Sequence, residues 1–224
     1  MNESLVNQTE ALTASGMLNQ IINFFEQGGL FMGIILLVWG VGLAICLERF
    51  SKLKKLDVNG ASFMNEIQRY VLSNDIQGAI RVCSGTVAAL PRVLKSGLKR
   101  SKQSTEQIQN AVDATTLEVI PKVESRLNYL QLIANVSTLF GLLGTIQGLI
   151  SSFAAVAAAD PTQKAEMLAN GIAKAMNTTF LGLCSAISIM ILHSILTAKA
   201  EKIINSIDEY SVKLIDLLGV KSSD

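Results

Sequence analysis

The sequence predicts an all-α integral membrane protein with three transmembrane helices. Three runs of the chain, residues 30–47, 127–159 and 175–198, contain no Asp, Glu, Lys or Arg. Each reaches the roughly 18 apolar residues at which a run becomes a candidate for a membrane-spanning helix. No pattern typical of a β-sheet accompanies them. The second run has 33 residues, about 50 Å of helix, so we expect part of it to project into water.

The distribution of basic residues predicts the orientation in the membrane. Residues 1–29 contain no Lys or Arg, residues 48–126 contain thirteen, residues 160–174 contain two and residues 199–224 contain four. Because basic residues accumulate on the cytoplasmic side of spanning helices, the N-terminus and the 160–174 loop are expected in the periplasm. The long middle segment and the tail are expected in the cytoplasm.

These observations divide the chain into seven segments. In order they are a periplasmic N-terminus that could include a helix on the membrane surface (1–29), a first span (30–47), a cytoplasmic helical segment (48–126), a second span with a cytoplasmic extension (127–159), a short periplasmic loop (160–174), a third span (175–198) and a cytoplasmic tail helix (199–224).

Within the middle segment, local signals predict where helices begin and bend. Asn74 or Asp75 is expected to cap a helix, because short polar side chains accept hydrogen bonds from helix N-termini. Pro91 opens another helix that continues to Lys99. From Thr105 the pattern predicts one long helix that runs into the second span and bends at Pro121.

The second and third spans each carry a face of small and hydroxyl-bearing residues. At 100° per residue, one arc of the second span and one face of the third collect such side chains. They are Ala134, Thr138, Gly141, Thr145, Gly148, Ser152, Ala155 and Ala159, and Gly171, Ala175, Thr179, Gly182, Ala186, His193 and Thr197. Gly144 and Gly148 add a small-xxx-small pair, which lets helices approach closely. Such faces could only pack, or their hydroxyl groups could coordinate water or a cation.

The residues that enzymes and metal sites need are absent. The chain has a single histidine and no CxxC, phosphate-loop or serine-hydrolase motif, and no carboxylate lies in the spans. The three cysteines, Cys46, Cys83 and Cys184, lie in different segments and suggest no metal site or pairing. We therefore expect no catalytic residue, no metal and no cofactor, and the net charge of +1 indicates no nucleic-acid partner.

Two motifs, however, resemble those of a known family. The stretch "IANVSTLFGLLGTIQGLISSF" (residues 133–153), followed by "GIAKAMNTTFLGL" (residues 171–183), is similar to the MotA/TolQ/ExbB family of bacterial inner-membrane ion-channel subunits, and to its ExbB/TolQ branch in particular. Glu48-Arg49-Phe50 and "IPKVESRLNYL" match the family as well, and the resemblance extends over about residues 25–205.

The resemblance implies a ring-forming homo-oligomer, a pentamer around a dimer of a single-span partner of the ExbD, TolR or MotB kind. The partner's membrane aspartate would bind the ion, and Thr145 and Thr179 would line its path. We add Ser152 to the predicted ion pathway because its hydroxyl lies on the same face. Other residues on or beside these faces are predicted to pack helices or face the partner: Gly141, Gly144, Gly148, Gly182 and Ala186.

Two positions depart from the family pattern. Thr138 stands where relatives commonly have proline, and Lys174 stands where ExbB and TolQ relatives usually have glutamate. A lysine at a helix centre costs roughly 2.5–3.5 kcal/mol, so Lys174 is expected to reach toward the outer interface as an anchor. A charge at the periplasmic mouth of the pathway, or a pairing with the partner's aspartate, is the alternative.

The predicted function is an inner-membrane motor or stator subunit that converts the proton gradient into mechanical work across the cell envelope. The work would be TonB- or Tol-type energy transduction or gliding motility. The alternative is a non-conducting membrane scaffold that anchors a partner. The sequence leaves open whether protons or sodium ions flow, which process is powered and which protein is the partner.

Overall fold

The computed structural model describes residues 29–221, and every regular element in that range is an α-helix. Three helical stretches are long and apolar enough to cross a membrane: Gly29–Leu72, Thr105–Ala158 and Lys164–Gly219. The predicted all-α class with three spanning helices is therefore confirmed. The surface helix expected within residues 1–29 falls almost entirely outside the described residues.

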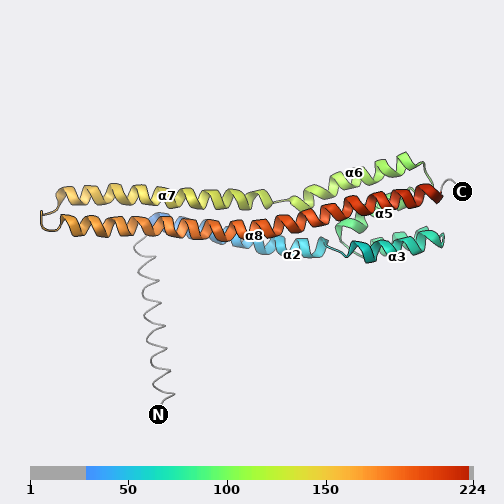
Figure 1. Ribbon diagram of the computed structural model, residues 1–224, viewed down its shortest axis with the longest axis horizontal. Helices are drawn as coiled ribbons and strands as arrows, with labels where there is room; N and C mark the ends of the chain where they lie inside the picture. Colours follow the sequence, from blue (N-terminus) through green and yellow to red (C-terminus); the bar gives the residue numbers. More distant parts are fainter. Residues whose placement is uncertain (1–28, 222–224) are drawn as a thin grey trace, which may run out of the picture. The chain divides into compact units, whose positions relative to one another are not determined.

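Seven helices make up the described chain (Figure 1). They are α2 (Gly29–Leu56), α3 (Gly60–Leu72), α4 (Ile76–Ser84), α5 (Ala89–Lys99), α6 (Thr105–Glu124), α7 (Leu127–Ala158) and α8 (Lys164–Lys221). They form two compact units, which are described separately. The span unit contains residues 29–44 and 130–191, and the extension unit contains residues 45–129 and 192–221.

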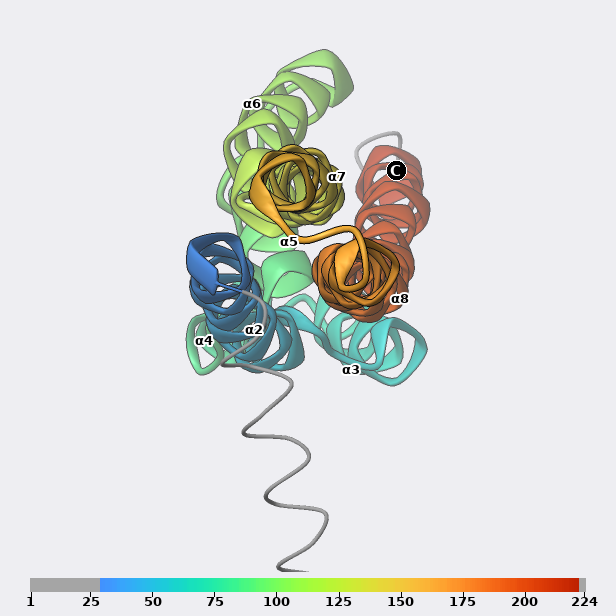
Figure 2. The ribbon, with the colours of Figure 1, turned by 90° about the vertical axis from the view of Figure 1, so that its left-hand side faces the viewer.

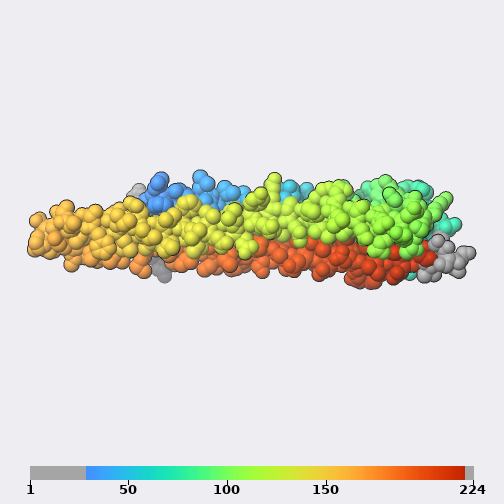
Figure 3. Space-filling model, turned by 90° about the horizontal axis from the view of Figure 1, so that it is seen from above, coloured from blue at the N-terminus to red at the C-terminus, as the bar shows by residue number. Residues whose placement is uncertain are grey.

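The span unit consists of three neighbouring helices. Its parts of α2, α7 and α8 appear end-on in Figure 2, and atoms of α7 adjoin those of the first half of α8 in Figure 3. α7 and α8 run antiparallel and are joined by residues 159–163. α8 begins at Lys164, eleven residues before the predicted start of the third span. Most of the expected 160–174 loop is thus helical, with Glu166 in the first turn, where a negative charge stabilises a helix.

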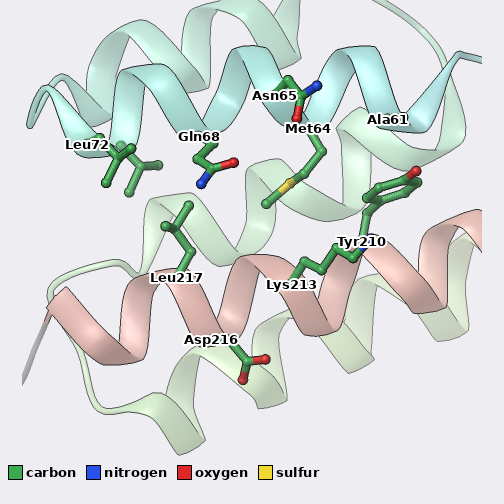
Figure 4. Close-up of a pocket in the computed structure, with 10 residues that line it drawn as sticks. Ala61, Met64, Asn65, Gln68, Leu72, Tyr210, Lys213, Asp216 and Leu217 are labelled. Carbon is green, nitrogen blue, oxygen red and sulfur yellow. The ribbon is translucent and has the colours of Figure 1, made fainter.

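In the extension unit α3, α5 and α6 contact the C-terminal part of α8, and α4 packs against α3 and α5. Gly97 of α5 marks a close meeting point of three helices, because a methyl group there would lie 2.9 Å from Val112 of α6 and 3.1 Å from Leu214 of α8. Between α3 and α8, side chains such as Met64 and Leu217 line an open groove of about 800 Å³ (Figure 4).

The expectation of one uninterrupted helix from Thr105 into the second span is wrong, because the chain breaks four residues after Pro121. α6 continues through Pro121 to Glu124, and Arg126 adopts a left-handed backbone conformation with φ +63° before α7 begins. Two side chains of α2 stabilise this break. Arg49 donates a 2.6 Å hydrogen bond to the Ser125 hydroxyl, and Arg126 forms a 2.6 Å ion pair with Glu48. The interruption therefore depends on tertiary contacts rather than on proline.

The junction between α3 and α4 uses both residues that were candidates for its cap. Asp75 is the N-cap of α4, and its carboxylate accepts a 2.8 Å hydrogen bond from the Gly78 N–H. Asn74 instead takes a left-handed conformation with φ +63°, which asparagine tolerates better than most residues. The tail continues in α8 to Lys221 without interruption.

Candidate ion-pathway site

The hydroxyl groups of Thr145 on α7 and Thr179 on α8 are hydrogen-bonded to each other. Each hydroxyl also lies within hydrogen-bonding distance of the Gly141 carbonyl oxygen, at 3.0 Å from Thr145 and 2.9 Å from Thr179. Because a hydroxyl carries one proton, one threonine donates to its neighbour and the neighbour donates to the carbonyl. The two side chains are half-buried in the single chain, so each keeps an accessible edge. The structure therefore brings the two predicted pathway threonines together at one backbone carbonyl.

Thr178 is a member of this cluster that the helical-wheel reasoning left off the hydroxyl face. Its hydroxyl is buried and donates to the Ala175 carbonyl at 2.7 Å, with a longer 3.4 Å contact to the Gly141 carbonyl. A carbonyl oxygen has two lone pairs, so three hydroxyl donors cannot all bond it well at once. The threonine hydroxyls can therefore exchange acceptors, and a hydroxyl oxygen remains available to an external group.

The close approach of α7 and α8 depends on glycine. A methyl group at Gly182 would lie 2.8 Å from the Ser137 carbonyl oxygen and 2.9 Å from the Gly141 Cα. One at Gly148 would lie 2.7 Å from the Ala175 Cβ, and Gly144 faces Thr178 in the same way. The two small-residue faces thus pack against each other within one chain.

Other predicted residues lie around this contact. Ser152 is buried, and its hydroxyl donates to the Gly148 carbonyl of its own helix at 2.7 Å. Ala186 is buried in the span unit. Trp39 of α2 donates a 2.9 Å hydrogen bond to the Ser188 hydroxyl and so connects α2 to α8. The sequence reasoning missed this contact, although an indole N–H within a span generally needs such an acceptor.

Lys174 lines a cavity of about 560 Å³ in the span unit, and Ser152 and Thr178 line the same cavity. The first residues of α2 line this cavity together with α7 and α8. Gln147 lines it too and has a 3.5 Å contact with Ser151 on its own helix.

The charged groups of the extension unit contrast with the uncharged spans. Hydrogen bonds from Lys52 and Arg126, together with the positive charges of both groups, hold the pKa of Glu48 below its ordinary value. Among the described residues, no group of three or more His, Cys, Asp or Glu side chains could hold a metal ion. The candidate site therefore consists of hydroxyl and carbonyl oxygens without a charge of its own.

Comparisons with known proteins agree with these features. Residues 86–209 match the family described as the MotA/TolQ/ExbB proton channel family. The chain is 26% identical over 190 residues to the "Putative biopolymer transport protein ExbB homolog" of Methanothermobacter thermautotrophicus, covering 84% of this chain and 67% of that protein. It is 33% identical over 99 residues to the Tol-Pal system protein TolQ of Haemophilus influenzae, covering 42% and 43% of the two chains. The solved structure of MotAB from C. jejuni shares the fold, with a TM-score of 0.63 at 15% identity over 98% of this chain and 90% of that one.

Proposed function

The chain belongs to the MotA/TolQ/ExbB proton channel family, and on this premise we propose that it is the ring-forming subunit of an ion-driven motor in the bacterial inner membrane. Its partner is a single-span protein of the ExbD, TolR or MotB kind with a carboxylate in its span. Downhill proton flow between the two would do mechanical work in the cell envelope. The names of the similar TolQ, ExbB-type and MotAB proteins support this proposal.

The observation that carries the proposal is the hydroxyl pair of Thr145 and Thr179 at the Gly141 carbonyl. Residues 127–159 and 175–198 contain no Asp or Glu, so a carboxyl group on this route must come from outside these two spans. A carboxyl group brought to the half-buried edge of the pair would find a hydroxyl donor for its charged form and an acceptor for its protonated form. Ion transfer at this site therefore requires the partner.

The remaining residues have supporting roles in this proposal. Gly141, Gly144, Gly148 and Gly182 let α7 and α8 approach closely enough for the two hydroxyls to meet. Ser152 would extend the pathway, although its proton is held by the Gly148 carbonyl. The exposed apolar side chains of the spans would face lipid or neighbouring copies in a pentamer. We retain the predicted orientation, with a periplasmic N-terminus and a cytoplasmic tail.

The threonine pair can be tested by replacing Thr179 with valine, which keeps the shape of the side chain and removes the hydroxyl. Proton flux is measured with a pH-sensitive dye in proteoliposomes that contain the chain and its partner, after size-exclusion chromatography shows an intact complex. Thr179→Val should abolish flux, and Thr179→Ser should restore most of it. Thr138→Val is the matched control, because Thr138 is exposed and bonds only the Ala134 carbonyl of its own helix. Wild-type flux in Thr179→Val would remove the pair from the mechanism.

A non-conducting scaffold is the second candidate, and Lys174 favours it, because a cation near one end of the spans opposes cation entry. The two candidates differ in their response to an uncoupler. Collapse of the cellular function by an uncoupler, with the complex intact, supports the motor, whereas an unchanged function supports the scaffold.

A further inference from the structure

The cavity beside Lys174 has the composition of a site for an amphipathic anion. Among residues 29–221, Lys174 is the only charged residue that lines it, and none of the lining side chains in this range is acidic. Lys174 also forms no ion pair within residues 29–221. Gln147 and Ser151 add an amide and a hydroxyl donor to the same wall. The cavity therefore offers donors and positive charge without a counter-ion.

The other walls are apolar. Leu30 and Phe31 at the start of α2 line the cavity, and the Leu30 side chain is 77% exposed. Most of the remaining lining is glycine and alanine, including Gly144, Gly148 and Ala155. A small inorganic anion would leave these apolar surfaces uncovered, whereas a ligand with a hydrocarbon chain would cover them.

The depth of the cavity along the spans agrees with such a ligand. Gly29 and Leu30 lie where the first uncharged run begins, and Lys174 immediately precedes the third one, whereas Gly144 and Gly148 lie inside the second run, so the cavity extends from these run ends into the span. The ends of uncharged runs mark the membrane–water interface, and this is where lipid phosphates lie. A lysine there interacts favourably with an anionic headgroup.

We propose that this cavity binds one glycerophospholipid. Its phosphodiester would contact the Lys174 ammonium and the donors of Gln147 and Ser151, and an acyl chain would lie along Leu30 and Phe31. In the predicted orientation the lipid belongs to the outer leaflet. The inference concerns lipid binding alone and does not depend on proton flow.

Native mass spectrometry of the purified, delipidated full-length protein tests this proposal. The protein is titrated with dioleoyl phosphatidylglycerol, and the affinity of the tightest-bound lipid is measured. Lys174→Gln should weaken it about five-fold, since one lysine near an anionic lipid contributes about 1 kcal/mol. Lys174→Arg should retain it. Lys164→Gln, at the start of α8 and outside the cavity, is the matched control and should bind as the wild type does.

Two further titrations distinguish the sources of the anion. Diolein, which lacks the phosphate, should bind no more tightly to the wild type than to Lys174→Gln. Inorganic phosphate should not displace the bound lipid. Equal lipid affinity in Lys174→Gln and wild type, tight binding of diolein or displacement by phosphate alone would each overturn the proposal. Wild-type proton flux in Thr179→Val, which would contradict the proposed ion pathway, would leave these binding results unaffected, so the two proposals can fail separately.

Discussion

Replacing Gly182 with alanine tests whether direct backbone contact between α7 and α8 stabilises the span unit. The added methyl group would lie 2.8 Å from the Ser137 carbonyl oxygen and 2.9 Å from the Gly141 Cα. Ordinary van der Waals contact begins at 3.4 Å, so α7 and α8 must separate by about 0.6 Å. Both contacts are with backbone atoms, and a change of side-chain rotamer cannot relieve them.

The expected cost follows from comparison with a glycine that has free space. Alanine at Gly40 of α2 would meet nothing within 4 Å, and replacing a helical glycine with alanine gains about 0.5–1 kcal/mol from backbone entropy. Gly182→Ala receives the same gain but adds an overpacking cost of roughly 1–3 kcal/mol. The difference in stability between the two variants therefore isolates the packing contribution.

Thermal unfolding of the purified protein in one detergent measures this difference. Gly182→Ala should unfold at a lower temperature than Gly40→Ala, by about 2–4 °C for each kcal/mol in a chain of this size. Because the Thr145 and Thr179 hydroxyls lie on the separated helices, proton flux should fall as well. Equal unfolding temperatures for the two variants would refute the argument that this contact stabilises the unit.

Two further predictions concern the extension unit. Burial raises the pKa of the Cys83 thiol from 9.0 to about 12, so the folded state keeps a neutral thiol that the unfolded chain ionises near pH 9. The resulting stabilisation is complete below pH 9 and is lost as the pH rises from 9 toward 12. Chemical denaturation measures the free energy of unfolding at pH 8 and at pH 10.5, and its decrease between them should be smaller in Cys83→Ala than in wild type. Equal decreases in the two proteins would contradict this prediction. Asp75→Ala should destabilise the protein by about 1 kcal/mol, because it removes the carboxylate that caps α4, whereas Asp75→Asn keeps a cap. Equal unfolding midpoints for the two Asp75 variants would argue against the cap.

The positions of the spans follow from the sequence because they depend on composition alone. A run without charges is stable in hydrocarbon and a run with charges is not. The small, hydroxyl-bearing faces are likewise visible, since α-helical periodicity determines which residues share a face. These local rules were sufficient to predict three helical spans and the two faces that carry Thr145 and Thr179, whereas their place in one pathway was implied by the family resemblance.

Other features depend on distant parts of the chain. The helical wheel orients Thr178 about its own helix axis, but it does not indicate that Gly144 and the Gly141 carbonyl lie opposite it. The break before α7 also depends on distant residues, and from local signals the sequence predicted only a bend at Pro121. The position of the break is stabilised by Arg49 and Glu48, which precede their partners by 76 and 78 residues.

The lipid proposal and the motor proposal are linked by electrostatics. Lys174 and Thr179 are separated by about 7.5 Å along α8 and by 140° around it. At a distance of ~10 Å and an effective dielectric constant of ~20, the Lys174 charge raises the free energy of a proton at the threonine pair by about 1.7 kcal/mol. This corresponds to a roughly 18-fold lower proton affinity at that site. Five such charges in a pentamer would oppose cation entry strongly. A phosphate beside each Lys174 would cancel most of this field, and the resulting site would admit protons to the threonine pair despite the lysine.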